Sequence, residues 1–341
     1  MKWDTNILTV CPVCEHGFTI IDDNHFMRVL RYHKDDAQTL GYIHYEMCPE
    51  CGIIFQWNMP TDETLREYYK VMYRRGNKTP PDNDFNIELF RARVLFEFWQ
   101  DTMGEAPKSL LDVGSSSGAL GGFFRNEGGT EIAVGVEYGE WREWSLRHLH
   151  AAYPSLDQVP ENLWHKFELV TMIHTLEHVT DPVKTVLQLR RLLALNGKVM
   201  IEVPNLHRPV FGSDVYSDEN CKRAIARKSI YQYAHTFAFT ARTLETLLDL
   251  AGLKIIERHP MIHNILVIAE LAAPKYSIKK PHPFFKQKIE LLWRLYGNSR
   301  FLRYWVVSGY RTFADRRADR LFTAIRKFRA KWHLLSKGLR T

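Results

Sequence analysis

The strongest pattern in this chain is an alternation of short apolar runs with stretches of helical apolar spacing between residues 110 and 270. Short apolar runs predict strands, and apolar residues three and four positions apart predict helices. Regular alternation of the two favours an α/β fold with a parallel, doubly wound sheet. The predicted strands begin near residues 110, 132, 167, 198, 254 and 265, and the predicted helices cover 85–98, a run after Gly118, 182–193 and 243–251.

The first 76 residues predict a separate and smaller domain. Strand-like alternation and one helix capped by Thr61 are expected there, at 26–32, 39–47, 53–56 and 61–69. A segment rich in Asn and Pro then separates this region from the α/β pattern, as a linker would. The predicted organisation is a small domain at 1–76, a linker at 77–84, an α/β domain at 85–274 and a C-terminal region at 275–341.

The turn after the first α/β strand carries the clearest indication of a ligand. Asp112 closes the strand, and a Gly/Ser loop at 114–118 leads into the next helix. Glycines at both ends of this loop let the backbone approach a ligand, and the helix start offers unpaired N–H groups. Ser116 excludes the Gly-x-Gly-x-x-Gly pattern of dinucleotide folds. Glu137 ends the next strand, where a carboxylate can accept hydrogen bonds from both hydroxyls of a ribose.

The spelling Asp-x-Gly-x-x-x-Gly resembles motif I of the class I S-adenosylmethionine-dependent methyltransferases, without that motif's middle glycine. His-x-x-Glu-His-Val-x-Asp-Pro from residue 174, Ile-Glu-Val-Pro-Asn from 201 and His-x-Phe-x-Phe-Thr from 235 are similar to a subgroup that methylates sugars and small molecules. The resemblance covers roughly residues 88–272 and implies a Rossmann-like methyltransferase sheet that binds S-adenosyl-L-methionine. It implies cofactor contacts from Asp112, Gly114, Ser115, Ser116, Gly118, Glu137 and His174, with Asp157 as the candidate for adenine.

Three histidines are the candidate catalytic residues. His174 and His178 flank a loop after the strand that begins near residue 167, and His235 lies further along the chain. A hydroxyl or acidic-carbon acceptor needs a base, and histidine titrates near neutral pH. His174-x-x-Glu-His178 also has the ligand spacing of inverted zinc peptidases. That chemistry needs both histidines on one helix, whereas this segment follows a strand and precedes Pro182, so a loop is expected.

Four cysteines at the amino end predict a metal site. Cys11-Pro-Val-Cys14 and Cys48-Pro-Glu-Cys51 are two Cys-x-x-Cys turns separated by 33 residues. Two such turns can direct four thiolates at one tetrahedral zinc ion, and a closed four-cysteine site is structural. A zinc-ribbon-like domain follows from this pattern. Similar amino-terminal domains occur in bacterial sugar C-methyltransferases and in some ribosomal-RNA methyltransferases. Disulfides or a redox pair are the alternatives, and we expect a reducing, cytoplasmic compartment because no secretory signal is evident.

The charge of this chain is unevenly distributed. The net charge is +7 overall, but residues 275–341 alone hold eighteen Lys and Arg against three Asp and Glu. Apolar residues at 321, 325, 328, 332 and 335 fall on one helical stripe, which predicts a basic amphipathic helix. Such a helix can pack on its own domain, lie peripherally on the inner face of a membrane, or bind RNA. No apolar run approaches the roughly 20 residues that cross a bilayer.

Three interpretations of function remain open from the sequence. The first is methyl transfer to a sugar, glycan precursor or related small molecule. The second, less favoured, is an RNA methyltransferase that holds nucleic acid through the cysteine domain and the tail. The third is a non-catalytic scaffold that retains the fold, which Ser116 in motif I keeps open. The sequence names neither the methyl acceptor nor the oligomeric state.

Overall fold

The computed structural model describes residues 4–17, 27–32, 39–69, 80, 82–205, 234–259, 264–276 and 278. All of these residues lie within one unit of the chain, Met1–Pro281. Nearly all of the predicted basic tail therefore lies outside the described residues, as does part of the predicted linker at 77–84. Within the described part, no helix is long and apolar enough to span a membrane.

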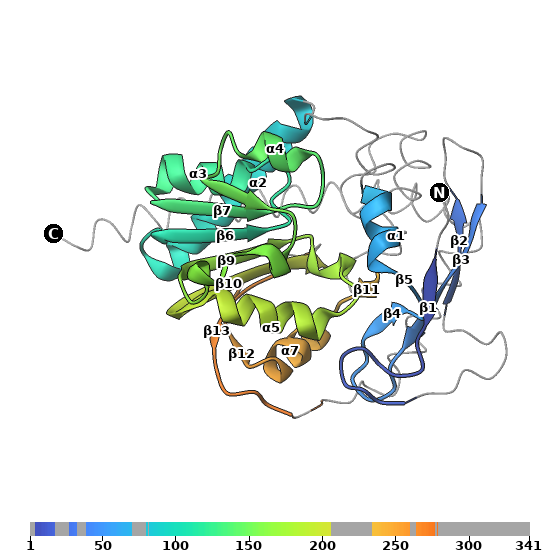
Figure 1. Ribbon diagram of the computed structural model, residues 1–341. Helices are drawn as coiled ribbons and strands as arrows, with labels where there is room; N and C mark the ends of the chain where they lie inside the picture. Colours follow the sequence, from blue (N-terminus) through green and yellow to red (C-terminus); the bar gives the residue numbers. More distant parts are fainter. Residues whose placement is uncertain are drawn as a thin grey trace, which may run out of the picture. The chain divides into compact units, whose positions relative to one another are not determined.

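A seven-stranded sheet forms the centre of the α/β region (Figure 1). Four neighbouring pairs are parallel, as predicted, whereas one strand runs antiparallel to both of its neighbours, so the sheet is mixed. The reason is a connection of only four residues between the last two strands, whereas a parallel crossover needs a dozen or more. In spatial order the strands are β12 (Leu253–His259), the antiparallel β13 (Asn264–Leu271), β10 (Leu193–Pro204), β9 (Phe167–Ile173), β6 (Ser109–Val113), β7 (Ile132–Val136) and β8 (Ala151–Tyr153).

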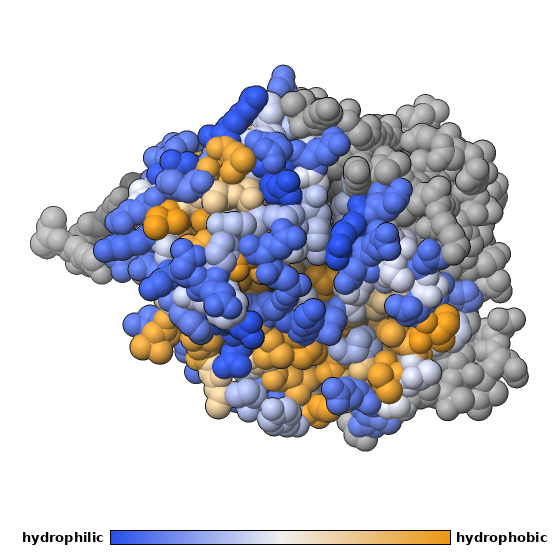
Figure 2. All heavy atoms as spheres, viewed as in Figure 1, coloured by the Kyte–Doolittle hydropathy of each residue, from blue (hydrophilic) through white to orange (hydrophobic). Residues whose placement is uncertain are grey.

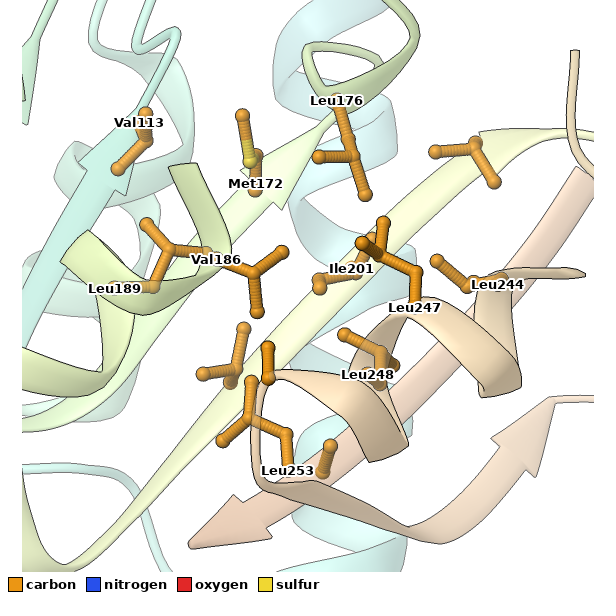
Figure 3. Packing of buried hydrophobic residues seen from close by; sticks show 14 of the residues in the cluster. Val113, Met172, Leu176, Val186, Leu189, Ile201, Leu244, Leu247, Leu248 and Leu253 are labelled. Carbon is orange, nitrogen blue, oxygen red and sulfur yellow. The ribbon is translucent and has the colours of Figure 1, made fainter. Parts of the chain in front are cut away.

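Both faces of this sheet are covered by helices. Successive strand residues point to opposite faces, so Leu110 packs in one buried cluster and Leu111 in the other. On one face α2 (Asp82–Met103) and α3 (Ala119–Gly128) contribute Leu95, Trp99 and Phe124. On the other face α5 (Pro182–Leu192) and α7 (Ala241–Leu250) direct leucines at the strands, as Figure 3 shows for Leu189, Leu244 and Leu247. The doubly wound arrangement is confirmed.

The helices begin where their capping residues predict. The side chain of Asp181 accepts a 2.9 Å hydrogen bond from the backbone N of Lys184, and Pro182 occupies the first turn of α5. Thr240 and Thr243 form a reciprocal capping box at the start of α7. Such caps satisfy backbone N–H groups that the helix itself leaves without partners. A shorter helix, α4 (Trp141–Ser145), lies between β7 and β8 in the chain.

The amino-terminal region contains two small sheets. Thr61 caps α1 (Asp62–Glu67) there, as predicted. One strand of the larger sheet, β11, comes from the segment just before α7, so this sheet joins two parts of the chain that are far apart in sequence. The first sheet pairs β1 (Thr5–Ile7) with β5 (Asn58–Pro60), and the second has the order β11 (Phe237–Ala238), β4 (Ile54–Gln56), β3 (Thr39–Met47) and β2 (Met27–Tyr32).

Hydrophilic and apolar residues are unevenly spread over the face seen in Figure 2. Hydrophilic side chains cover most of the area around α3 and α4, whereas apolar ones gather around α7 (Figure 2). Exposed large apolar side chains occur singly on several elements, including Phe90 of α2 and Leu187 of α5. Scattered exposure of this kind is usual for a folded domain and does not by itself mark a binding surface.

Candidate functional site

The strand order of the large sheet reverses beside β6. β7 and β8 continue on one side of β6, and β9 and β10 lie on the other. Ligands of open α/β sheets bind outside the carboxyl ends of the strands at such a reversal. We therefore divide the candidate site into two parts. The cofactor half comprises the groups at and after the ends of β6 and β7, and the acceptor half comprises those after β9 and β10.

The two halves touch at one glycine. A Cβ atom placed on Gly114, at the end of β6, would overlap the Oγ1 atom of Thr175, which follows β9. Gly114 also has a φ of 81°, a left-handed conformation that side chains disfavour. Glycine is therefore required here both by the backbone conformation and by the close approach of the second loop.

Two carboxylates bind the loop at 114–118. Oε2 of Glu137 accepts a 2.8 Å hydrogen bond from the backbone N of Ser116, and Oε1 accepts one of 2.9 Å from the N of Gly139. Glu88 of α2 accepts hydrogen bonds from the hydroxyls of Ser116 and Ser117 and from the backbone N of Ser117. The carboxylate predicted to bind ribose thus lies directly against the loop predicted to bind the cofactor.

Asp112 is buried between this loop and the neighbouring strand. Its Oδ1 accepts a 2.7 Å hydrogen bond from the hydroxyl of Thr171 on β9. Burial raises the pKa of Asp112 to about 7, the Thr171 hydrogen bond opposes this, and the charges of Glu88 and Glu137 add to it. A site with three carboxyl groups so close together is electrostatically suited to a cationic ligand.

The cofactor half fits S-adenosyl-L-methionine in charge and in hydrogen bonding. Ser115 has a buried hydroxyl with no hydrogen-bond partner among the described residues, so it is available to a ligand. Gly118, the N-cap of α3, has no side chain to bond to the first N–H groups of the helix. The sulfonium and ammonium groups of the cofactor are positive and complement the carboxylates named above. Asp112, Glu88 and Glu137 with Ser115 are the groups that would hold it.

Asp157 lies near the cofactor half. It belongs to a 3-10 turn at Leu156–Gln158, and its Oδ1 accepts a hydrogen bond from Nε2 of Gln188 on α5. Burial raises the pKa of Tyr138, the residue after Glu137, and the negative charge of Asp157 contributes to the rise. The position is compatible with the predicted adenine contact, which stays a prediction.

His174 is the central side chain of the acceptor half. It follows β9 directly and has a φ of 50°, in the left-handed region that few non-glycine residues adopt. Its Nδ1 lies 3.2 Å from Oε1 of Glu177, and its Nε2 lies 3.2 Å from Oε1 of Glu202 on β10. Asn264 of β13 also donates to that Glu202 oxygen. The ring is therefore held between two buried carboxylates, and the strained backbone indicates that its position is imposed by this network.

The network decides the charge of His174. Burial disfavours a charged imidazole, but the hydrogen bonds and charges of Glu177 and Glu202 outweigh it and raise the pKa of His174 to about 9. Burial would raise the pKa of Glu177, yet the neighbouring histidines lower it to about 2. An imidazolium has no lone pair to accept a proton, and both of its N–H groups face carboxylates here, so this geometry weighs against His174 as the base and favours a role in holding Glu177 and Glu202 in place.

His178 and His235 lie beside Glu177. Nδ1 of His178 lies 2.9 Å from the carbonyl oxygen of Ala234, to which it donates, leaving Nε2 as the acceptor. Burial lowers the pKa of His178 despite the charge of Glu177, so this ring is neutral near pH 7. The rings of His178 and His235 meet edge to face with centroids 4.6 Å apart. The segment from 174 to 178 forms a loop and a 3-10 turn, which disfavours the zinc-peptidase arrangement as expected.

Sequence reasoning missed two members of the site. Glu88 comes from the helix that precedes the first strand, and Asn264 begins the antiparallel strand. Neither stands in a motif, and each reaches the site only through the tertiary fold. No signal in a single sequence distinguishes them from other polar residues at helix and strand ends.

The four cysteines of the amino-terminal region converge at one point. Their sulfur atoms all lie within 4.8 Å of one another. The Sγ atoms of Cys11 and Cys51 are 3.7 Å apart and those of Cys14 and Cys48 are 3.5 Å apart, so neither pair is a disulfide. Tetrahedral zinc with Zn–S bonds of about 2.3 Å places sulfurs about 3.8 Å apart. The cysteines therefore fit a four-coordinate zinc ion.

Comparison with known proteins supports this reading of the sheet. The sequence profile of a family described as "Methyltransferase domain" matches residues 87–258. No curated protein sequence matches significantly.

Among solved structures, 1,6-didemethyltoxoflavin-N1-methyltransferase from Burkholderia thailandensis is 16% identical over 70% of this chain and 98% of its own, with a TM-score of 0.45. An S-adenosylmethionine-dependent methyltransferase from Aquifex aeolicus is 12% identical over 62% of this chain and 100% of its own, with a TM-score of 0.41. A proposed O-methyltransferase from Nostoc punctiforme is 19% identical over 53% of this chain, with a TM-score of 0.40. This chain spans 56% of the length of that protein.

The family match covers half of the chain and includes most of the sheet, the cofactor loop and, apart from Asn264, the acceptor half. The resemblance seen in motif I is thereby confirmed. The chain belongs to the methyltransferase-domain family and is an S-adenosylmethionine-dependent methyltransferase.

Proposed function

We propose that this protein methylates a hydroxyl-rich small molecule, such as a sugar or a glycan precursor. The observation that supports this best is the acceptor half itself. Buried carboxylates and imidazoles, with His174 bound to Glu177 and Glu202, stand next to the cofactor loop. Dense, fixed donors and acceptors suit a ligand with several hydroxyl groups, because buried polar groups require partners.

The two halves have different roles in the reaction: the cofactor half holds the methyl donor, and the acceptor half binds the acceptor and takes its proton. When bound, S-adenosyl-L-methionine supplies an electrophilic methyl group on a sulfonium. Glu137, Glu88 and Ser115 orient the cofactor, and protonated His174, bound to Glu177 and Glu202, fixes these two carboxylates beside the acceptor. The acceptor's proton leaves toward the cluster of Glu177, His178 and His235, where His178 is neutral. Holding two reactants in line at close range supplies much of the rate enhancement in such a transfer.

The four cysteines are proposed to bind a structural zinc ion. Their sulfurs match the tetrahedral spacing, and four protein ligands leave no position for a substrate. We expect Cys48→Ser to lower the zinc content measured by mass spectrometry by one ion per chain and to lower the melting temperature. Zinc content equal to that of the native protein would contradict the assignment.

Calorimetric titration with S-adenosylhomocysteine tests the cofactor half first. Micromolar binding that Glu137→Ala abolishes is the expected result, and absence of binding by the native protein would favour the scaffold interpretation. Methyl transfer is then assayed with nucleotide sugars and glycolipids, with ribosomal RNA as the comparison. Methylation of RNA, with none of the sugars or glycolipids, would contradict the proposed acceptor class and favour the RNA methyltransferase interpretation.

Peripheral membrane contact through residues 275–341 is a separate proposal, and it rests on the charge and the apolar stripe of that segment. Co-sedimentation with vesicles containing phosphatidylserine, against vesicles of phosphatidylcholine alone, tests it. Equal sedimentation with both would contradict an electrostatic attachment.

A further inference from the structure

Three side chains of the acceptor half form a group with the composition of a metal site. One ligand atom from each of Glu177, His178 and His235 can be chosen so that all lie within 4.8 Å of one another. Two imidazoles and one carboxylate are a common ligand set for divalent transition metals, and three protein ligands leave coordination positions open. This group is separate from the four cysteines in chain position and in ligand chemistry.

The hydrogen bonds of His178 leave one of its ring nitrogens available to a metal ion. Because Nδ1 of His178 donates to the carbonyl of Ala234, its Nε2 presents a lone pair. That Nε2 atom lies 3.8 Å from Oε1 of Glu177. Ligands about 2.1 Å from a cation lie about 3 to 3.5 Å apart, so small side-chain rotations bring Glu177 and His178 to coordinating distance.

A buried carboxylate oxygen at this point lacks a partner. The Glu177 side chain is 1% exposed, and its Oε2 has no hydrogen bond among the described residues. Buried charged oxygens without a partner are costly, and a bound cation is one way to satisfy them. Glu177 shares its imidazole partner, His174, with a second buried carboxylate, Glu202. A cation at Oε2 would give Glu177 a partner that it does not share with Glu202.

We propose that Glu177, His178 and His235 bind a divalent transition-metal cation at the carboxyl end of β9. The open coordination positions then take oxygen atoms of the methyl acceptor, a role that rests on the proposed function, whereas cation binding does not. His178 acts as a ligand in this arrangement, so the cation, and not a free imidazole, favours loss of the acceptor's proton.

Manganese distinguishes this site from the cysteine cluster, because Mn²⁺ prefers oxygen and nitrogen ligands and thiolates prefer zinc. Full-length protein that holds one Zn²⁺ per chain, the amount that the four thiolates take, is titrated with Mn²⁺, and free Mn²⁺ is followed by its electron paramagnetic resonance signal. We expect one Mn²⁺ per chain, and at least about tenfold weaker binding in Glu177→Gln and in His235→Asn. His165→Asn, at an exposed histidine outside the group, is the matched control and should bind Mn²⁺ as the native protein does.

Binding of S-adenosylhomocysteine by each variant reports whether the cofactor half is intact. Loss of Mn²⁺ binding with retained S-adenosylhomocysteine binding supports the proposal. If the native protein binds S-adenosylhomocysteine but no Mn²⁺, or if both variants bind Mn²⁺ as tightly as the native protein, the metal site is refuted and the proposed function stands. If the native protein binds Mn²⁺ but not S-adenosylhomocysteine, the proposed function fails and the metal site stands.

Discussion

The cofactor half and the acceptor half are built in different ways. The cofactor half depends on the main chain, since Glu137 bonds to backbone N–H groups and Gly114 allows the loops to touch. The acceptor half depends on side chains from β10 and β13 that converge on His174. Apart from Glu88 of α2, the cofactor half uses residues close together in sequence, whereas the acceptor half assembles residues from more distant segments. The halves should therefore respond to different substitutions, and four predictions test this.

The largest expected effect concerns Asp112. An unfolded aspartate ionises near pH 4, whereas the pKa of Asp112 in the folded protein is about 7. Between these values the folded protein keeps a proton that the unfolded chain has lost. The contribution of Asp112 to stability is therefore complete below about pH 4, falls as the pH rises to about 7, and is constant above that. The native protein should lose up to roughly 4 kcal/mol of unfolding free energy between pH 4 and pH 8 that Asp112→Asn does not lose. The difference between the two proteins should therefore shift by that amount in favour of the variant.

Urea denaturation of the ligand-free protein at several pH values measures this difference. Asp101→Asn, at an exposed carboxyl on α2, is the control and should show a nearly constant offset from the native protein. A pH-independent difference for Asp112→Asn would show that Asp112 titrates normally.

The next prediction concerns Gly114, and it separates the stability cost of a left-handed backbone from the cost of the close contact with Thr175. Gly114→Ala should lower the unfolding free energy by about 3 kcal/mol, because it adds an atom that overlaps Thr175 and forces a left-handed alanine. Gly104→Ala is the matched control, since Gly104 has a φ of 83° and nothing within 4 Å of the added atom. It should lose only about 1 kcal/mol. Thr175→Ala should restore part of the stability of Gly114→Ala, and equal losses at the two glycines would contradict the contact between the halves.

The third effect is on ligand affinity. Glu137→Ala should weaken S-adenosylhomocysteine binding about a hundredfold, because it removes charged hydrogen bonds to the ligand and to the loop. Glu202→Gln, in the acceptor half, should leave that affinity within about threefold, since it lies outside the cofactor loop. Calorimetry on both variants measures the contrast, and similar losses would show that the two halves are not separable.

The smallest effect is expected at Asn264. Asn264→Ala removes a donor to Glu202 and should cost about 1 kcal/mol of stability. It should raise the KM for the acceptor without changing the affinity for S-adenosylhomocysteine, as steady-state kinetics and calorimetry would measure. A change in cofactor affinity larger than the change in KM would contradict the assignment of Asn264 to the acceptor half.

The difference between the halves also explains what the sequence could predict. Asp112, Gly114 and Glu137 stand at fixed positions relative to a strand and its turn, so local pattern was enough to place them together. The four cysteines were predictable for the same reason. Glu88 and Asn264 were missed because only tertiary packing brings them to the site. The strand β13 was predicted, but its antiparallel direction was missed because apolar alternation indicates a strand and not its direction.

The charge state of His174 also lay beyond the sequence. Histidine usually titrates near neutral pH, and the prediction of a base rested on that value. The raised pKa depends on Glu177 and Glu202 being buried on either side of the ring, and β10 contributes one of them from a separate strand. Only a sheet with the register Glu202↔Ile173 brings these groups together.

Because strand β11 comes late in the chain, the cysteine-containing region cannot complete its fold early in translation. Phe237 and Ala238 pair with β4, while Tyr45 and Gln56 donate hydrogen bonds to the carbonyl of His235. The sheet around the cysteines therefore cannot be completed until the ribosome has translated some 180 further residues, and this amino-terminal region does not finish folding first. For the same reason, an exchange of this region between related enzymes would have to transfer β11 as well, or the hybrid would leave an open strand edge beside His235.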